Sequence, residues 1–218
     1  MFADEWETIY QKGEQLNAYP YTEVVSLLHR FKSHNTSGNI LDVGCGSGVH
    51  AELFAKFGFN VDAFDGSKAA IDFAKKKYQE IQEINFFEMT TDNFVSDIKY
   101  DLVLDRLCTS QTGLVSTKNF YKNIKGNLYN GATIFWKGFC SDNSGKEFSK
   151  FFDKNNGYWD DFTDGEFKDL GCTTFFTISD VESIFDGYEL KDIREISDKN
   201  YKTKYLANHW QVEAIYNK

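Results

Sequence analysis

The stretch Ile40-Leu41-Asp42-Val43-Gly44-Cys45-Gly46-Ser47-Gly48 decides the fold. Its apolar start predicts a short buried strand, its three glycines predict a tight loop, and the apolar spacing at 53–57 predicts a helix directly behind the loop. Glycine allows a backbone to approach a ligand closely, and the first turn of a helix offers unpaired N–H groups. A ligand site is therefore predicted where this strand ends.

The alternation of strand and helix continues outward from this unit. Further strands are predicted at 60–64, 84–88, 101–104 and 133–136, with helices at 67–78 and 117–128. A short helix at 179–185 and strands at 189–196 and 211–216 follow later in the chain. Such alternation needs right-handed crossovers and gives a parallel sheet with helices on both faces. The predicted fold class is therefore α/β, with a doubly wound, mostly parallel, seven-stranded sheet.

Two segments stand outside this alternation. Apolar residues recur at helical spacing after Pro20, with Thr22 as a suitable N-cap, so residues 1–37 are predicted to form an N-terminal helical cap. Residues 139–177, after the fifth strand, form a predicted insertion with some local helix around 148–152. Its length and many aromatic residues predict either a lid or a dimer interface. We expect a single domain over residues 1–218, as a monomer or a homodimer.

Composition narrows the classes of partner. The chain has 218 residues, of which 41% are hydrophobic and 17% aromatic, and this is enough for one large core. A formal net charge of -9 repels polyanions and so disfavours a nucleic-acid partner. The basic run at 75–77 has acidic residues on both sides and is typical of a solvated helix face.

Cysteine spacing and hydropathy give further expectations. The four cysteines, at 45, 108, 140 and 172, lack CxxC spacing, so neither a metal site nor a disulfide framework is predicted. No run approaches the roughly 20 apolar residues that a membrane helix needs. The default expectation is a reduced, cytoplasmic protein without a membrane partner.

The glycine loop also indicates the kind of ligand. Asp42 stands two residues before Gly44, and Val49 occupies the place where a dinucleotide-binding loop has glycine or alanine. A pyrophosphate is repelled by a nearby carboxylate, whereas S-adenosylmethionine carries a sulfonium and an ammonium and no phosphate. The sequence therefore favours S-adenosylmethionine over a nicotinamide dinucleotide.

Residues 41–48 resemble the first motif of class I, Rossmann-like S-adenosylmethionine-dependent methyltransferases of the small-molecule type. The resemblance covers most of the chain and implies an antiparallel last strand, with the cofactor held by Asp42, Gly44, Cys45 and Gly46. Asp65, followed by Gly66 and Ser67, resembles the second-strand acid that grips the ribose of the cofactor. A carboxylate at a strand tip can accept two hydrogen bonds from a cis-diol. Capping of the next helix is the alternative role of Asp65.

The resemblance implies two further contacts to the cofactor. Thr91, Asp92, Asn93 and Phe94 resemble the loop that holds adenine, although a plain turn also uses Asp and Asn. The N-terminal segment resembles an aromatic cap that folds over the cofactor, with Tyr10 and Tyr21 as its candidate contacts. Simple packing of that cap onto the sheet is the alternative.

Residues 100–106 resemble the fourth family motif and place Asp105 at the ligand edge of the sheet. Three roles stay open for Asp105: to hold the methionine ammonium, to orient a nucleophile as a catalytic residue, or to pair with Arg106. His209 is the candidate catalytic base, with packing in a strand as its alternative. The predicted substrate-binding residues share the same rim and are Arg106, Lys137, Phe139 and Tyr201.

The predicted function is methyl transfer from S-adenosylmethionine to an oxygen or nitrogen atom of a small molecule. A sugar or sugar-derived metabolite is one candidate acceptor, because aromatic side chains in the insertion offer stacking faces. The alternatives are an NAD(P)-dependent oxidoreductase on the same fold and a non-catalytic protein that binds S-adenosylmethionine. No metal is expected to take part.

Overall fold

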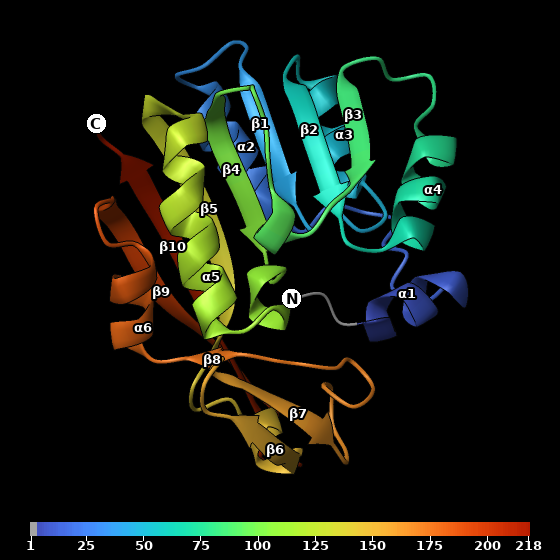
Figure 1. The fold of residues 1–218 in the computed structure, drawn as a ribbon, viewed down its shortest axis with the longest axis vertical. Helices are drawn as coiled ribbons and strands as arrows, with labels where there is room; N and C mark the ends of the chain where they lie inside the picture. The colour runs from blue at the N-terminus through green and yellow to red at the C-terminus, as the bar shows by residue number, and fades with distance from the viewer. Residues whose placement is uncertain (1–3) are drawn as a thin grey trace.

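The computed structural model describes residues 4–218 and is built around one mixed sheet of eight strands (Figure 1). Seven strands lie in the order β3-β2-β1-β4-β5-β10-β9, and β8 pairs with the end of β5. The strands of this sheet are β1 (Asn39–Val43), β2 (Asn60–Asp65), β3 (Ile84–Glu88), β4 (Tyr100–Arg106), β5 (Leu128–Cys140), β8 (Phe175–Phe176), β9 (Glu189–Lys199) and β10 (Leu206–Tyr216). The predicted α/β fold class is confirmed, and the two-residue β8 is an addition to the seven predicted strands.

The direction of the strands also matches the prediction. Strands β1 to β5 pair in parallel, whereas β10 runs antiparallel to both β5 and β9. The central strands therefore end together at one edge, which lies at the bottom of the sheet in Figure 1. Ligands of doubly wound sheets bind at this edge.

Helices cover both faces of the sheet because successive strand residues point to opposite sides. Ile40 packs with α2 (Thr22–Lys32), α3 (Val49–Lys56) and α4 (Lys68–Lys77). Leu41 and Val43 pack with α5 (Leu114–Asn123) and α6 (Ile178–Ile184) on the other side. The two faces are called the α2/α3 face and the α5 face below.

Several predicted boundaries are wrong. The helix expected at 117–128 is α5 at Leu114–Asn123, followed by a 3-10 turn over Ile124–Asn127. Leu128 instead opens β5, because it pairs with Tyr100 of β4. Pairing with β10 and β8 carries β5 on to Cys140, well past the predicted end at 136. Long-range strand pairing set these ends, and local sequence does not show it.

The N-terminal cap forms two helices, as predicted, over its described part. Helix α1 (Asp4–Gln11) is anchored by Glu7, which accepts hydrogen bonds from Ser67 Oγ at 2.6 Å and Ala69 N at 3.1 Å at the start of α4. The N-cap of α2 is Tyr21 rather than the predicted Thr22, and no side chain caps this helix. Residues 1–3 of the predicted cap lie outside the described residues.

The insertion is a hairpin and not a helix. A 3-10 turn over Ser144–Phe148 leads into β6 (Ser149–Asp153) and β7 (Tyr158–Phe162), so the helix predicted around 148–152 is wrong. Asp153 ends the first strand by accepting hydrogen bonds from two backbone amides of the turn, and such turn chemistry selects a hairpin. A small core of Phe139, Phe162, Phe167 and Phe175 fixes the insertion to the sheet.

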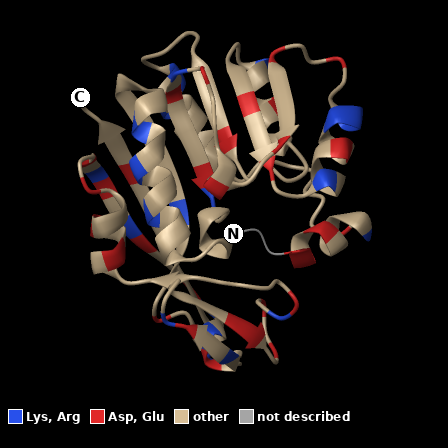
Figure 2. Cartoon of the chain, in the orientation of Figure 1, with Lys and Arg blue, Asp and Glu red and all other residues tan. Residues whose placement is uncertain are grey.

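Surface charge is mixed in the part of the chain that Figure 2 colours. The basic run at 75–77 is exposed at the end of α4, as predicted, and Asp72 precedes it on the same helix (Figure 2). Within residues 4–218, no helix has both the length and the apolar character needed to cross a bilayer. The cysteines at 45, 108, 140 and 172 are all free thiols.

Candidate functional site

A cavity of about 440 Å³ lies at the edge where β1, β2 and β4 end. Its walls come from the N-terminal cap, the glycine loop after β1, the segment after β4, and the insertion. Pockets that bind small ligands usually have volumes of about 300–1,000 Å³. The predicted ligand edge of the sheet therefore does contain a cavity.

The three glycines of the loop serve two purposes. Gly44, Gly46 and Gly48 adopt positive φ angles of 67°, 51° and 79°, which side chains disfavour. A Cβ atom on Gly44 would lie 2.4 Å from the Cys108 side chain, and one on Gly46 would lie 2.6 Å from Tyr10 Oη. Both of these glycines line the cavity. Gly48 instead lets α3 pack closely against Phe86 in the core.

Asp42 presents a buried carboxyl group to the cavity, and one of its two oxygens is unpaired. Its side chain is 2% exposed, and Oδ2 has no hydrogen-bond partner within residues 4–218. Burial, followed by repulsion from Asp65 and Asp105, raises the pKa of Asp42 to about 8. A buried carboxylate without a partner is costly to ionise, and a cationic ligand relieves that cost.

Asp65 closes the glycine loop onto the tip of β2. Its Oδ2 accepts a hydrogen bond from Gly46 N, and its Oδ1 accepts one from Ser67 N, both at 2.9 Å. Burial raises the pKa of Asp65 to about 6 in spite of these hydrogen bonds. Ser67, which is fully buried, is itself the side-chain cap of α4, so capping does not account for Asp65. Each carboxylate oxygen keeps a second lone pair for a ligand in the cavity.

Asp105 does not reach the cavity. The register pairs it with Val43, and both side chains point to the α5 face, where Tyr121 lies. Its oxygens accept hydrogen bonds from Cys108 N, Thr109 N, Thr109 Oγ1 and Tyr121 Oη, at 2.6–3.3 Å. The proposed pairing with Arg106 is wrong, since Arg106 bonds elsewhere. Asp105 therefore holds the segment after β4 in place and lines neither this cavity nor the second one, on the insertion, so its contact with cofactor or acceptor stays a prediction.

A cluster of three charges lies on the opposite, α2/α3 face. Glu23 Oε1 accepts hydrogen bonds from Arg106 Nε and Lys137 Nζ, both at 3.0 Å. Burial alone would raise the pKa of Glu23, but its own backbone amide and the two cations lower it to about 2. Arg106 lines the cavity, and its guanidinium carbon lies 3.2 Å from the centre of the Tyr21 ring. Lys137 is not part of the cavity wall. This group is called the Glu23 cluster below.

Two histidines line the cavity beside this cluster. Burial, followed by Lys137 and Arg106, lowers the pKa of His209 to about 4. Burial and Arg106 lower the pKa of His50 to about 4 as well. Both imidazoles are neutral at pH 7 and can accept a proton. The His209 ring also packs 5.3 Å from Phe139, so the predicted strand packing and the predicted place at the cavity are compatible.

The N-terminal cap covers the glycine loop as the resemblance implies. Tyr10 and Tyr21 both line the cavity, together with Gly66 and Cys45 of the predicted set. Ser47 Oγ donates a hydrogen bond to the carbonyl of Asn17 at 3.0 Å, which ties the cap to the loop.

Some predicted residues lie away from the cavity. Phe94 follows a 3-10 turn over Thr91–Asn93, and its ring packs at 5.4 Å from Phe64 and 5.7 Å from Phe120 in the core. None of residues 91–94 lines the cavity, so the adenine contact stays a prediction. Tyr201 is 85% exposed in the turn between β9 and β10, and nothing brings it to the cavity.

The insertion contributes the wall opposite the glycine loop. Phe139, Phe167, Leu170 and Glu166 line the cavity, whereas the hairpin tip packs against the start of α5, where Val115 N donates to the Asn156 carbonyl at 3.3 Å. Glu166 is exposed at the rim and accepts a hydrogen bond from Tyr205 Oη at 2.8 Å. The wall is therefore apolar inside and polar only at its mouth.

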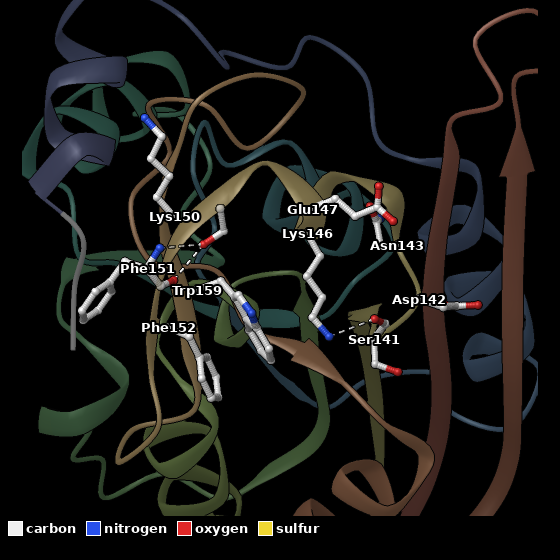
Figure 3. A pocket seen from close by; sticks show the side chains of 10 residues that line it. Ser141, Asp142, Asn143, Lys146, Glu147, Lys150, Phe151, Phe152 and Trp159 are labelled. Carbon is white, nitrogen blue, oxygen red and sulfur yellow. Dashed lines mark hydrogen bonds between the residues drawn. The ribbon is translucent and has the colours of Figure 1, made fainter.

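A second cavity of about 470 Å³ lies on the insertion (Figure 3). Lys146 crosses it and donates to the Ser141 carbonyl at 3.2 Å, and the rings of Phe152 and Trp159 lie 4.3 Å apart. It shares no lining residue with the first cavity and lacks the glycine loop and buried acids.

A further cluster lies near the start of the insertion. Ligand atoms of Cys140, Asp142 and Glu195 all lie within 4.8 Å of one another. The amide of Asn208 donates to both carboxylates at 2.9 Å, so hydrogen bonds already satisfy them. This arrangement explains the cluster without a metal ion.

Several residues that line the cavity or lie beside it are not apparent from the sequence. Glu23 looks like an ordinary acid in the first turn of a helix, and its partners are 83 and 114 residues away. His50 lies two residues after Gly48, and Cys108 lies two residues after Arg106. Their closeness in sequence to the glycine loop and to the end of β4 could have identified both as cavity residues. The other missed lining residues include Gln111, Thr112, Glu166, Phe167 and Leu170.

Solved structures share this fold over nearly the whole chain. The Burkholderia thailandensis 1,6-didemethyltoxoflavin N1-methyltransferase, with S-adenosylhomocysteine bound, matches with a TM-score of 0.72 at 14% identity, covering 99% of this chain and 87% of that one. An S-adenosylmethionine-dependent methyltransferase from Methanosarcina mazei matches with a TM-score of 0.70 at 16% identity, covering 91% and 99%. The fold is that of the Rossmann-like, class I methyltransferases.

The sequence narrows this class to a family. Residues 40–131, which contain the glycine loop, Asp65 and β4, match the model of the methyltransferase domain family. The chain therefore carries a class I S-adenosylmethionine-dependent methyltransferase domain, and its cofactor is S-adenosylmethionine.

Curated relatives match over a shorter span. The ubiquinone biosynthesis O-methyltransferase of Rickettsia akari is 35% identical over 100 residues, which is 44% of this chain and 40% of that protein. The malonyl-[acyl-carrier protein] O-methyltransferase 1 of Ilyobacter polytropus is 36% identical over 67 residues, or 30% of this chain and 25% of that protein. The match thus spans less than half the length of either relative.

Proposed function

We propose that this chain transfers the methyl group of S-adenosylmethionine to an oxygen or nitrogen atom of a small molecule. One observation carries the proposal: the buried carboxyl group of Asp42, whose Oδ2 has no hydrogen-bond partner within residues 4–218, lies beside the glycine loop at one end of the cavity. A cationic cofactor fits this carboxylate, whereas an anionic dinucleotide is repelled by it. The nicotinamide-dependent alternative is therefore not favoured.

The residues at the loop end suit each part of the cofactor. Asp42 offers negative charge to a cation, and the two oxygens of Asp65 face a cavity that a ribose diol can enter. A Cβ atom on Gly44 or Gly46 would intrude on the cavity lining, so the loop is shaped for close approach. When bound, the cofactor supplies an electrophilic methyl group, and the chain supplies its alignment with the acceptor.

The other end of the cavity suits an acceptor. Phe139, Phe167 and Leu170 exclude water from one wall, and the neutral ring of His209 is a candidate proton acceptor. His50 Nε2 already accepts a hydrogen bond from Tyr21 N at 3.5 Å. Proton acceptance is needed for hydroxyl groups and for protonated amines, so both oxygen and nitrogen acceptors fit. The two curated relatives are named as O-methyltransferases, which favours oxygen. A sugar-derived acceptor stays a prediction that rests on the aromatic wall.

The insertion is proposed to act as a lid. Its inner side chains line the cavity, and its outer rings, Phe151 and Phe152, are 50% and 47% exposed. Deleting residues 142–171 should abolish transfer and spare the affinity for S-adenosylhomocysteine. Sedimentation of the same variant tests the dimer interface: loss of a dimer with transfer intact would reject the lid.

Calorimetry with S-adenosylhomocysteine and NAD tests the cofactor, and a panel of hydroxyl, amine and acid acceptors tests transfer. We expect binding of S-adenosylhomocysteine, no binding of NAD, and acceptor-dependent formation of S-adenosylhomocysteine from S-adenosylmethionine. Cofactor binding without transfer to any acceptor would favour a non-catalytic binding protein. Binding of NAD alone would overturn the proposal.

A further inference from the structure

The two ends of the main cavity carry opposite charge. Asp42 and Asp65 lie buried at the glycine loop, while Arg106 lines the far part with Lys137 behind it. In the Glu23 cluster two cations share one carboxylate, so the group carries one positive charge in excess. Its side chains are only 12–17% exposed, so water screens this charge poorly.

The guanidinium of Arg106 has hydrogen-bonding capacity to spare. Only its Nε is used, toward Glu23, and no other hydrogen bond of this side chain is found within residues 4–218. Tyr21 supports the flat face of the guanidinium at 3.2 Å and fixes its plane. An oriented guanidinium with unused terminal N–H groups matches the two oxygens of a carboxylate or a similar anion.

The neighbouring groups do not cancel the excess charge. His50 and His209 are neutral, so they add hydrogen-bonding groups and no anion. Glu166 is the other acid on this side of the cavity lining, but it is exposed at the rim and bonds to Tyr205 Oη. The buried carboxyl groups at the loop offer an anion no cationic partner, whereas Arg106 does.

We propose that the methyl acceptor carries an anionic group, such as a carboxylate, which the Arg106 guanidinium binds with Lys137 behind it. This inference rests on the proposed function and names the chemical class of its acceptor. The opposite charges then hold the cationic cofactor and the anionic acceptor at opposite ends of one cavity. A cationic amine or a neutral sugar without an acidic group would bring no anion of its own to Arg106, and only the carboxylate of the cofactor would remain as a partner.

Matched acids and amides test the inference directly. Protein saturated with S-adenosylhomocysteine is titrated with three pairs: acetate and acetamide, benzoate and benzamide, phenylacetate and phenylacetamide. We expect at least one acid to bind tenfold or more tightly than its amide, and to compete with acceptor in the transfer assay. Equal affinity within every pair, including no measurable binding of any acid, would overturn the proposal.

Variants locate the selectivity. Arg106→Gln should remove the preference for the acid. The control is Arg30→Gln: Arg30 lies on α2 and pairs with Glu213 of β10, so this variant should leave the preference unchanged. Glu23→Gln removes the counter-charge and should strengthen acid binding several-fold, which gives a second test if Arg106→Gln fails to fold. Unchanged acid binding in folded Arg106→Gln, or weaker acid binding in folded Glu23→Gln, would contradict the assignment.

Affinity for S-adenosylhomocysteine is measured separately in each variant. It should stay within twofold of the unsubstituted protein, because the Glu23 cluster lies away from the glycine loop. If S-adenosylhomocysteine does not bind the unsubstituted protein, the proposed function fails. If it binds and the acids show no preference, only the anionic acceptor fails.

Discussion

The glycine-loop end and the Arg106 end of the cavity are built in different ways. At the loop end, the charged groups Asp42 and Asp65 come from two consecutive strand tips, and each is followed by glycine. At the other end, Glu23, Arg106 and Lys137 come from a helix and two strands that are far apart in the sequence. The first end is a local motif, and the second is a product of the sheet order.

This difference follows from what each end has to do. Loop geometry must place backbone close to a ligand, and only neighbouring glycines with positive φ angles allow that. The Glu23 cluster needs only that β4 and β5 lie side by side, with Arg106 in register with Lys137 and α2 packed above them. Such an arrangement can vary between proteins that share the fold and the cofactor.

The largest expected effect is on the loop end. Asp42→Asn removes the carboxylate that we propose meets the cofactor, so affinity for S-adenosylmethionine should fall about 100-fold, the scale of a lost interaction of about 1.5–3 kcal/mol. The same variant should melt at a higher temperature without ligand, because a buried, unpaired acid is removed. Calorimetry and thermal melting measure both. Asp72→Asn, on the exposed side of α4, is the control and should change neither.

A smaller loss is expected from a methyl group in the loop. In Gly46→Ala the new Cβ lies 2.6 Å from Tyr10 Oη, and the positive φ adds strain of about 1 kcal/mol. Affinity for S-adenosylhomocysteine should fall about tenfold by the same scale of energies. Adding Tyr10→Phe removes the clashing hydroxyl and should restore part of the affinity. Identical affinities of the single and double variants would show that Tyr10 does not cover the loop.

Stability without ligand should depend on pH through Asp42. Its pKa is raised to about 8 in the folded chain, so the folded state keeps a proton that the unfolded state has lost, and stability falls as pH rises toward 8. Asp65 and Asp105, with pKa values of about 6, contribute little to this change above pH 6.5. His50 and His209 act in the opposite direction, because their pKa is lowered to about 4 in the folded chain while an unfolded imidazole still loses its proton near pH 6.5.

Chemical unfolding between pH 6.5 and 8 checks this dependence. We expect the Asp42 contribution, taken as the difference between the unsubstituted protein and Asp42→Asn, to lower the free energy of unfolding by up to about 1.4 kcal/mol per pH unit. Saturating S-adenosylmethionine should remove this difference. Equal slopes in the two proteins without ligand would assign the proton to another group.

The smallest effect on ligand binding is expected on the α5 face. Tyr121→Phe removes one hydrogen bond to Asp105, so the free energy of unfolding should drop by about 1–3 kcal/mol. Affinity for cofactor and acceptor should remain unchanged, because Asp105 lies outside both ends of the cavity. A clear loss of affinity in a stably folded variant would return Asp105 to the site.

Most of the fold and the loop end could be predicted from the sequence, because both depend on short-range patterns. Strand and helix alternation predicted the sheet, and the glycines predicted the cavity. The misplacement of Asp105 was avoidable: Leu102 and Leu104 face α2/α3, so alternation puts Asp105 on the other side. The same alternation puts Arg106 on the α2/α3 face, where it lines the cavity.

The rest depends on tertiary contacts without a local signal. Nothing in residues 22–32 distinguishes Glu23 from a solvated acid until α2 packs over β4 and β5. Tyr201 does lie between the last two strands, as predicted. However, β9 and β10 extend beyond the cavity, so the turn that joins them is exposed to solvent. The hairpin in the insertion depends on the turn at Asp153. The many aromatic residues of this segment gave no sign of that turn in the sequence.

Proton release on cofactor binding tests the central claim most directly. At pH 6.5 Asp42 is protonated in the ligand-free chain, and a bound cation should ionise it. Calorimetry of S-adenosylmethionine binding in two buffers of different ionisation enthalpy should therefore show release of about one proton per cofactor. Binding without proton release, or with proton uptake, would contradict the claim that the loop end holds a cation against a buried carboxylate.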